Sequence, residues 1–330
     1  MTPLPLPDDA TLAAVLGSLL ARDGVATLVA RRPNACFSSS PTEIVTLALP
    51  DGTRRELFVK YGRPARDPEP RCRQDVAYCG LVYERIVHRL PMRMIRCLGV
   101  AAIGDRPDAA LVLEHLGDAL RVNEAPDDSG VLAAAEWCGR LHAWGKAVVG
   151  DPRLAFLTRY EAEYYRAWSQ RAVRLAAAAG GRVPAWLERV CADFDDRVAM
   201  LAAAERTVIH GEFGPQNVLW KDGGVYPVDW ESAAVGPGAI DLATLLFAWP
   251  ADTVRRGIEA YWHPQGTPPP DFEATFAAAT LYTAFRWLPE PTAADDPGWL
   301  AGLVRIEWAA RAAPSRRAEP HVSLAPTPPR

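Results

Sequence analysis

Hydrophobic positions follow two different patterns along the chain. Up to about residue 116, apolar residues gather in short runs bounded by turn-forming residues, which is typical of strands. Pro50-Asp51-Gly52 separates two such runs and predicts a hairpin. The expected elements are a helix capped by Asp8 or Asp9, strands at 44–49 and 56–61, a helix at 73–90, and strands around 97–100 and 110–114.

Beyond this part, apolar residues recur at helical spacing in alanine-rich segments. Helices are expected at 131–146, 159–178, 184–204, 238–249, 253–262, 271–288 and 297–312. The change predicts an α+β protein with a small, β-rich N-terminal lobe over 1–116 and a larger helical C-terminal lobe over 117–313. Residues 314–330 are rich in proline and show no periodicity, so we expect a disordered tail.

Composition excludes several classes of protein. The net charge of -4, without a basic block, argues against a nucleic-acid partner. No apolar run reaches membrane-spanning length and the first residues do not resemble a signal peptide, so we expect a cytoplasmic protein without a membrane partner. The six cysteines form no CxxC pair or sequence cluster with histidine, and are expected to be reduced thiols. The oligomeric state is not predicted.

One segment carries a candidate reaction centre. Glu212 follows His210-Gly211, Asn217 comes five residues after Glu212, and Asp229 follows the hairpin sequence around Asp222-Gly223-Gly224. An amide oxygen and a carboxylate at one end of a hairpin suit magnesium bound to nucleotide phosphates. The alternative is a surface hairpin in which Asn217 and Asp229 only cap turns, although Asp222-Gly223-Gly224 already supplies the turn chemistry.

Three motifs in this order resemble the aminoglycoside phosphotransferase and choline kinase branch of the protein-kinase-like fold. They are His-Gly-acid-x-x-x-x-Asn from 210 to 217, Val-Asp-Trp-Glu from 228 to 231, and Gly-Pro-Gly-Ala-Ile-Asp-Leu-Ala from 236 to 243. The resemblance covers nearly the whole chain. It implies a bilobal fold that binds ATP and Mg²⁺ and phosphorylates a small molecule.

The resemblance also implies roles for individual residues. Glu212 would orient or deprotonate the acceptor hydroxyl, where most of the family has Asp, and Asn217 and Asp229 would hold magnesium. Lys60 would bind the α- and β-phosphates, and the rarity of lysine in this chain favours a demand for an ammonium group there. Further nucleotide contacts are expected from Ser38, Ser39 and Ser40 in a phosphate loop, and from Glu114 and Leu116 at the adenine.

The acid that pairs with Lys60 is ambiguous. In the expected helix, the position of the family glutamate falls at Cys79. Asp75 lies one turn earlier on the same face, and Glu84 lies on another face. We prefer Glu84 because its side chain reaches farther.

Other polar residues favour structural roles. His210 is expected to order the loop by hydrogen bonding, and His142 to be a satisfied core histidine. Asp241 either caps a helix or ties down the catalytic loop, and the sequence does not separate the two. Two aromatic stripes favour core positions over an acceptor cleft: Tyr160, Tyr164, Tyr165 and Trp168 with Glu161, and Tyr261, Trp262, Tyr282 and Trp287 with Arg286.

The sequence therefore predicts an ATP-dependent O-phosphotransferase for a small hydroxylated metabolite, such as an antibiotic or its precursor. We expect the acceptor site among the helices after residue 150. The alternative is a nucleotide-binding pseudokinase with a regulatory or scaffolding role, because Glu212 replaces the usual Asp. The sequence does not indicate whether ATP or GTP is the phosphate donor.

Overall fold

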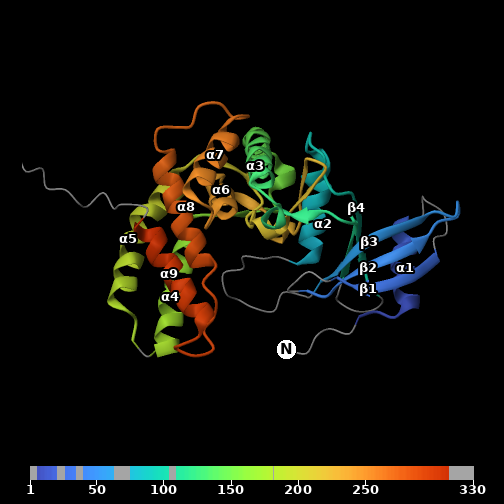
Figure 1. The fold of residues 1–330 in the computed structure, drawn as a ribbon, viewed down its shortest axis with the longest axis horizontal. Coiled ribbons are helices and arrows are strands. Elements are labelled where there is room, and N and C mark those ends of the chain that lie inside the picture. Colours follow the sequence, from blue (N-terminus) through green and yellow to red (C-terminus); the bar gives the residue numbers. More distant parts are fainter. Residues whose placement is uncertain are drawn as a thin grey trace, which may run out of the picture. The chain divides into compact units, whose positions relative to one another are not determined.

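The computed structural model describes residues 6–20, 27–34, 40–62, 75–103, 109–180 and 182–311. Contacts divide the chain into two compact units, one of residues 1–161 and 205–269 and the other of 162–204 and 270–330. Figure 1 shows the ribbon coloured along the sequence. The lobe boundary expected at 116–117 stays a prediction, because contacts group the first strands with the segment that carries Glu212 and Asp229.

An antiparallel sheet of five strands forms the first part of unit 1, in the order β1-β2-β3-β5-β4. The strands are β1 (Thr27–Pro33), β2 (Thr42–Ala48), β3 (Arg54–Tyr61), β4 (Cys97–Ala102) and β5 (Ala109–Glu114). The expected hairpin is confirmed as β2 and β3, and the expected strand pair as β4 and β5. The sequence did not predict β1, which pairs with β2 at the sheet edge.

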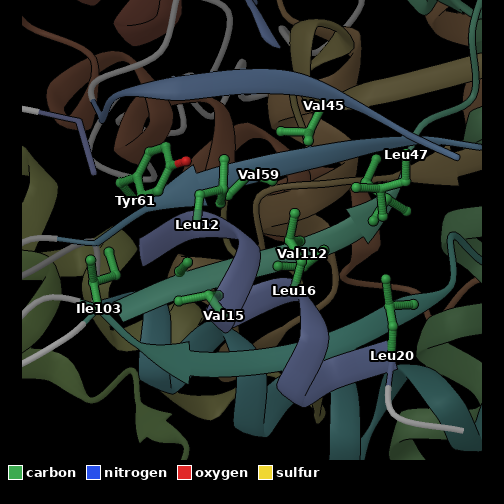
Figure 2. Packing of buried hydrophobic residues seen from close by; sticks show 12 residues of the cluster. Leu12, Val15, Leu16, Leu20, Val45, Leu47, Val59, Tyr61, Ile103 and Val112 are labelled. Atoms are coloured by element: carbon green, nitrogen blue, oxygen red, sulfur yellow. The ribbon is translucent and has the colours of Figure 1, made fainter. Parts of the chain in front are cut away.

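Helix α1 (Asp9–Leu20) packs on one face of this sheet and buries Leu12, Val15, Leu16 and Leu20. Figure 2 shows these side chains beside Val45, Val59 and Val112 of the strands. Successive residues of a strand point to opposite faces, so Leu57, Val59 and Tyr61 of β3 join this core. Lys60, between them, therefore points to the other face.

Helix α2 (Val76–Arg85) begins at Asp75, whose side chain accepts a hydrogen bond from the backbone N–H of Tyr78. The helix packs against β4 and β5. A Cβ on Gly80 would lie 2.4 Å from Cγ2 of Val100 in β4, so the glycine lets the helix approach the sheet. The helix buries Cys79 and Val82.

The other described residues of unit 1 form two small sheets and three α-helices, with short 3-10 turns between them. One sheet has the order β10-β9-β6 and the other β7-β11-β8. Their strands are β6 (Leu120–Arg121), β7 (Thr158–Arg159), β8 (Arg206–Ile209), β9 (Val218–Lys221), β10 (Gly224–Pro227) and β11 (Ala234–Pro237), and the helices are α3 (Ser129–Val148), α6 (Ala239–Leu246) and α7 (Ala251–Trp262). Gly139 and Gly145 bring α3 close to its neighbours, because their Cβ atoms would lie 2.1 Å from the carbonyl oxygen of Tyr261 and 2.3 Å from Oγ1 of Thr207.

The described residues of unit 2 form four helices. They are α4 (Ala162–Gly180), α5 (Ala185–Ala203), α8 (Phe272–Arg286) and α9 (Pro297–Arg311). The expected helices of the second part of the chain are thus confirmed in both units. The core interpretation of the aromatic stripes is confirmed for their buried members, which are Tyr160, Tyr165, Trp168, Tyr261, Tyr282 and Arg286.

Among the described residues, no helix combines the length and the apolar character needed to span a bilayer. The tail predicted at 314–330 lies outside the described residues.

Candidate active site

A cavity of about 200 Å³ opens on the face of the first sheet opposite α1. Lys60 lines it together with Asn217 and Asp229, which come from a distant part of the sequence. The remaining wall is mostly apolar, as expected of a ligand site with a few polar anchors. It includes Ile44, Phe58, Ile95, Leu111, Leu113, Leu219 and Val228.

The predicted hairpin brings Asn217 and Asp229 to this cavity. Strands β9 and β10 pair antiparallel, with Val218 opposite Pro227. Just beyond that pair, the backbone N–H of Val228 donates to the carbonyl oxygen of Asn217 at 2.9 Å. The two candidate metal ligands therefore lie at the same end of the ribbon.

Their local geometry suits a divalent cation. The amide nitrogen of Asn217 donates to the carbonyl oxygen of Glu212 at 3.0 Å, which leaves the amide Oδ1 as an available acceptor. Asp229 has φ of 68° and ψ of 54°, in the left-handed region that non-glycine residues rarely adopt. An amide oxygen beside a carboxylate is a donor set that fits magnesium, so both residues are candidates to hold it.

Lys60 is bound by two carboxylates in the buried part of the site. Its Nζ contacts Oδ1 of Asp229 and lies 2.7 Å from Oε1 of Glu231. Burial lowers the pKa of Lys60, but the two carboxylates outweigh burial and raise it above its ordinary value. Since the ordinary pKa is already far above neutrality, Lys60 carries its positive charge throughout the neutral pH range.

These contacts correct the expected pairing of Lys60 with Glu84. Glu84 is exposed on α2, and Asp75 is used as the helix cap. Cys79 lines the cavity, and its thiol is close enough for the charges of Glu231 and Lys60 to act on it. Sequence reasoning missed Glu231, although it stands in the Val-Asp-Trp-Glu motif, because a helix-borne acid was expected.

The loop before Asn217 is held by Asp241 in the first turn of α6. One carboxylate oxygen accepts the backbone N–H of His210 at 2.6 Å, and the other accepts that of Gly211 at 2.8 Å. Gly238, not Asp241, stands at the cap position of α6. The structure therefore supports the loop-tying role among the two considered for Asp241.

His210 and Gly211 are both needed for this loop conformation. The ring of His210 is buried, and its Nε2 hydrogen bonds with the carbonyl oxygen of Val228 at 2.9 Å. Burial lowers the pKa of His210, so the neutral ring is favoured. Gly211 has φ of +81°, and a Cβ there would lie 2.0 Å from the carbonyl oxygen of Ser232. The expected ordering role of His210 agrees with these bonds.

Behind Asp241 lies a buried hydrogen-bond network. Nε2 of His142 is 3.1 Å from Asp241, and Nδ1 is 2.9 Å from the hydroxyl oxygen of Tyr261. The carboxylate can only accept, so we assign the Nε2 proton to His142 and the Nδ1 bond to donation by Tyr261. The prediction of a satisfied core histidine is confirmed.

Cys138 adds a thiol to this network, 3.8 Å from both ring nitrogens of His142. The sequence showed no cysteine and histidine cluster, yet the two residues lie one helical turn apart on α3 and form with Asp241 a buried group of possible metal ligands. Both ring nitrogens already have partners, and burial raises the pKa of Cys138 well above its ordinary value. We interpret the group as a hydrogen-bond network and not as a metal site.

Glu212 is buried, with 2% of its surface exposed, and does not line the described cavity. Its backbone carbonyl accepts from Asn217, which does line it. The loop therefore fixes the backbone of Glu212 beside the candidate metal ligands. Its role as the residue that receives the acceptor hydroxyl stays a prediction.

The segment expected to contact adenine lies in the wall of the same cavity. Glu114, His115 and Leu116 all line it. Nζ of Lys221 donates to the carbonyl oxygen of Leu116 at 2.9 Å, which ties this segment to β9. Ser38 and Ser39 lie outside the described residues, and Ser40 is half-buried before β2, so the serine phosphate loop stays a prediction.

Comparison with known protein families matches most of the chain to a phosphotransferase family. Residues 46–314 match the model of a family described as the phosphotransferase enzyme family. This range covers most of the chain, from β2 to beyond α9. No curated protein matches the sequence.

Solved structures with a similar fold include several phosphotransferases. Macrolide 2'-phosphotransferase MphH from Brachybacterium faecium is 17% identical, with a TM-score of 0.54 over 93% of this chain and 99% of that one. A choline/ethanolamine kinase family protein from Mesorhizobium loti is 14% identical, with a TM-score of 0.59 over 92% and 94%. The ternary complex of APH(2'')-IIa with streptomycin and ATP is 11% identical, with a TM-score of 0.55 over 93% and 99%. The expected protein-kinase-like fold is confirmed.

Proposed function

Because this chain belongs to the phosphotransferase enzyme family, and is therefore a small-molecule kinase, we propose that it transfers the γ-phosphate of ATP to a hydroxyl group of a small metabolite. The observation that carries the proposal is the composition of one cavity. Lys60, Asn217 and Asp229 meet there, and Glu114 to Leu116 form another part of the wall. A cation, two candidate metal ligands and a backbone segment in the wall of an apolar cavity match what a nucleoside triphosphate requires.

In the proposed reaction, the acceptor oxygen attacks the γ-phosphorus in line with the bond to the bridging oxygen of ATP. The new oxygen–phosphorus bond forms as the old one breaks, and ADP leaves. Glu212 orients the hydroxyl and receives its proton. A positioned base contributes on the order of 100- to 10,000-fold, whereas alignment and charge neutralisation supply most of the catalysis. Glutamate in place of aspartate is therefore compatible with turnover.

Two polar groups would hold the cation. Asn217 presents its amide oxygen, because its nitrogen is engaged by Glu212, and Asp229 presents a carboxylate. Magnesium bound there would neutralise phosphate charge. Lys60 binds the phosphates as a compact ammonium, and its contact with Asp229 shows that the two side chains reach the same point.

The acceptor is proposed to be an antibiotic or a biosynthetic precursor of one. A macrolide phosphotransferase and a streptomycin complex are among the proteins with a similar fold, while another is a choline/ethanolamine kinase family protein. Sugars and cyclic metabolites, including macrolides, are therefore the first acceptors to test, with choline as a contrasting one.

A screen of hydroxylated compounds with ATP and magnesium tests the proposal. We expect one compound to gain the mass of a phosphate, and Asp229→Ala to abolish that gain. Asp222→Asn, on the exposed turn of the same hairpin, is the matched control and should retain activity. If Glu212→Ala and Asp229→Ala both keep full activity, the proposed roles are wrong. If ATP binds but neither a metabolite nor water ever receives phosphate, the chain is the pseudokinase that the sequence left as an alternative.

A further inference from the structure

We propose that Glu231 is the positioning residue that holds Lys60 for the nucleotide phosphates, because α2 presents a thiol, Cys79, and no carboxylate at the cavity that Lys60 lines. This inference rests on the proposed function. It assigns to the segment after β10 a task that protein kinases give to a helix of the small lobe. The lysine and the candidate metal ligand Asp229 would then be ordered by one short stretch of chain.

The contact itself is buried and direct. Nζ of Lys60 lies 2.7 Å from Oε1 of Glu231, and the two side chains are 5% and 7% exposed. A buried ion pair of this kind fixes both partners, because an unpaired charge there would be costly. Glu231 lies in the short 3-10 helix Trp230–Ser232, directly after Asp229.

The helix offers no equivalent acid in its described residues. Within Val76–Arg85 the only carboxylate is Glu84, which is exposed, and Asp75 is engaged as the helix cap. Cys79 is 1% exposed and lines the cavity beside Lys60. Helix α2 also packs against the segment Trp230–Ser232, so Glu231 approaches Lys60 from the side of Cys79.

Because both Asp229 and Glu231 contact Lys60, one carboxylate can bind the cation while the other holds the lysine. If magnesium engages Asp229, Glu231 still keeps Lys60 in place. Glu231 would then act through Lys60, and a carboxylate delivered from α2 should replace it. A metal ligand would not be replaceable in this way, because its oxygen would have to reach the cation and not the ammonium.

The chemical reactivity of Lys60 gives a test that needs neither nucleotide nor turnover. The chain has three lysines, so limited acetylation followed by peptide mass spectrometry measures the acetylation of Lys60 against that of Lys146 and Lys221 at one fixed pH. Glu231→Gln should increase the acetylation of Lys60 relative to the other two lysines several-fold, because Nζ loses its buried contact with the carboxylate at 2.7 Å. Glu231→Asp, which keeps the charge and the fold, should change the acetylation less.

The rescue variant is Cys79→Glu combined with Glu231→Gln. We expect it to return the acetylation of Lys60 toward the native level and to recover part of the ATP turnover lost in Glu231→Gln. Glu84→Gln, on the exposed face of the same helix, should leave both unchanged. Cys79→Ser combined with Glu231→Gln controls for the loss of the thiol and should rescue neither.

Three results would overturn the inference: unchanged acetylation of Lys60 in both Glu231 variants, an equal change in Glu84→Gln, or rescue of the acetylation level without any rescue of turnover. A failure of the proposed function would give a different set of results. In that case the native protein transfers no phosphate from ATP, while Lys60 still responds to Glu231→Gln in the absence of nucleotide.

Discussion

Removing the hydroxyl of Tyr261 tests the buried network behind the loop that runs from His210 to Asn217. The change Tyr261→Phe takes one donor from Nδ1 of His142, 2.9 Å away, and leaves the ring in place. Tyr261 is 3% exposed and His142 is fully buried, so water does not replace the lost bond. A buried acceptor left without a partner costs about 1–3 kcal/mol of the free energy of unfolding.

Tyr83→Phe is the matched control, because it deletes the same atom from another buried tyrosine. The hydroxyl oxygen of Tyr83 has no hydrogen-bond partner among the described residues. Removing an unsatisfied polar group is neutral or slightly stabilising. The two identical changes are therefore expected to have different effects.

Urea unfolding followed by tryptophan fluorescence measures the difference. We expect the midpoint to fall for Tyr261→Phe and to stay or rise for Tyr83→Phe. Since His142 bonds Asp241, which holds the backbone of His210 and Gly211, kcat should also fall in Tyr261→Phe while the KM for ATP changes less. Equal losses of stability in both variants, or none in Tyr261→Phe, would refute the network.

Three further predictions concern single positions. Gly211→Ala should unfold the protein or abolish turnover, because its Cβ would lie 2.0 Å from the carbonyl oxygen of Ser232, whereas Gly223→Ala, also at positive φ but in open space, should cost only about 1–2 kcal/mol in thermal unfolding. Lys60→Arg should lower ATP turnover and phosphate affinity in a kinetic assay, since a planar guanidinium does not fit the position of a compact ammonium in a buried pair. Burial raises the pKa of Cys97 to about 11, so its iodoacetamide alkylation at pH 8, read by mass spectrometry, should be on the order of 100-fold slower than that of a free cysteine and should accelerate as the pH rises.

Local patterns in the sequence predicted most of the fold. Pro50-Asp51-Gly52 predicted the turn between β2 and β3, and helical spacing predicted every helix from α3 to α9. Strand β1 was missed because it lies at a sheet edge and most of its residues are exposed, so its apolar and polar positions do not alternate. The sequence did not predict strands β8 and β11, which are only four residues long and are separated along the chain by the β9–β10 hairpin.

Site residues were predictable where one segment carries them and not where two segments meet. The spacing of Asn217 and Asp229 around a turn was enough to place both at one end of a ribbon. The acid that pairs with Lys60 could not be predicted, because it depends on how α2 packs. The expected partner was Glu84, but the structure shows Glu231, which is distant in the sequence and near in space. The hydrogen-bond partners of His142 could not be predicted either, because His142 of α3 meets Asp241 of α6 and Tyr261 of α7 only in the folded chain.

The slow hydrolysis of ATP in the absence of any acceptor tests the central claim most directly, because water can replace the metabolite in a competent site. The account predicts magnesium-dependent release of phosphate by the native protein, a similar rate for Asp222→Asn, and loss of release in Asp229→Ala. Phosphate release that continues unchanged in Asp229→Ala would contradict it.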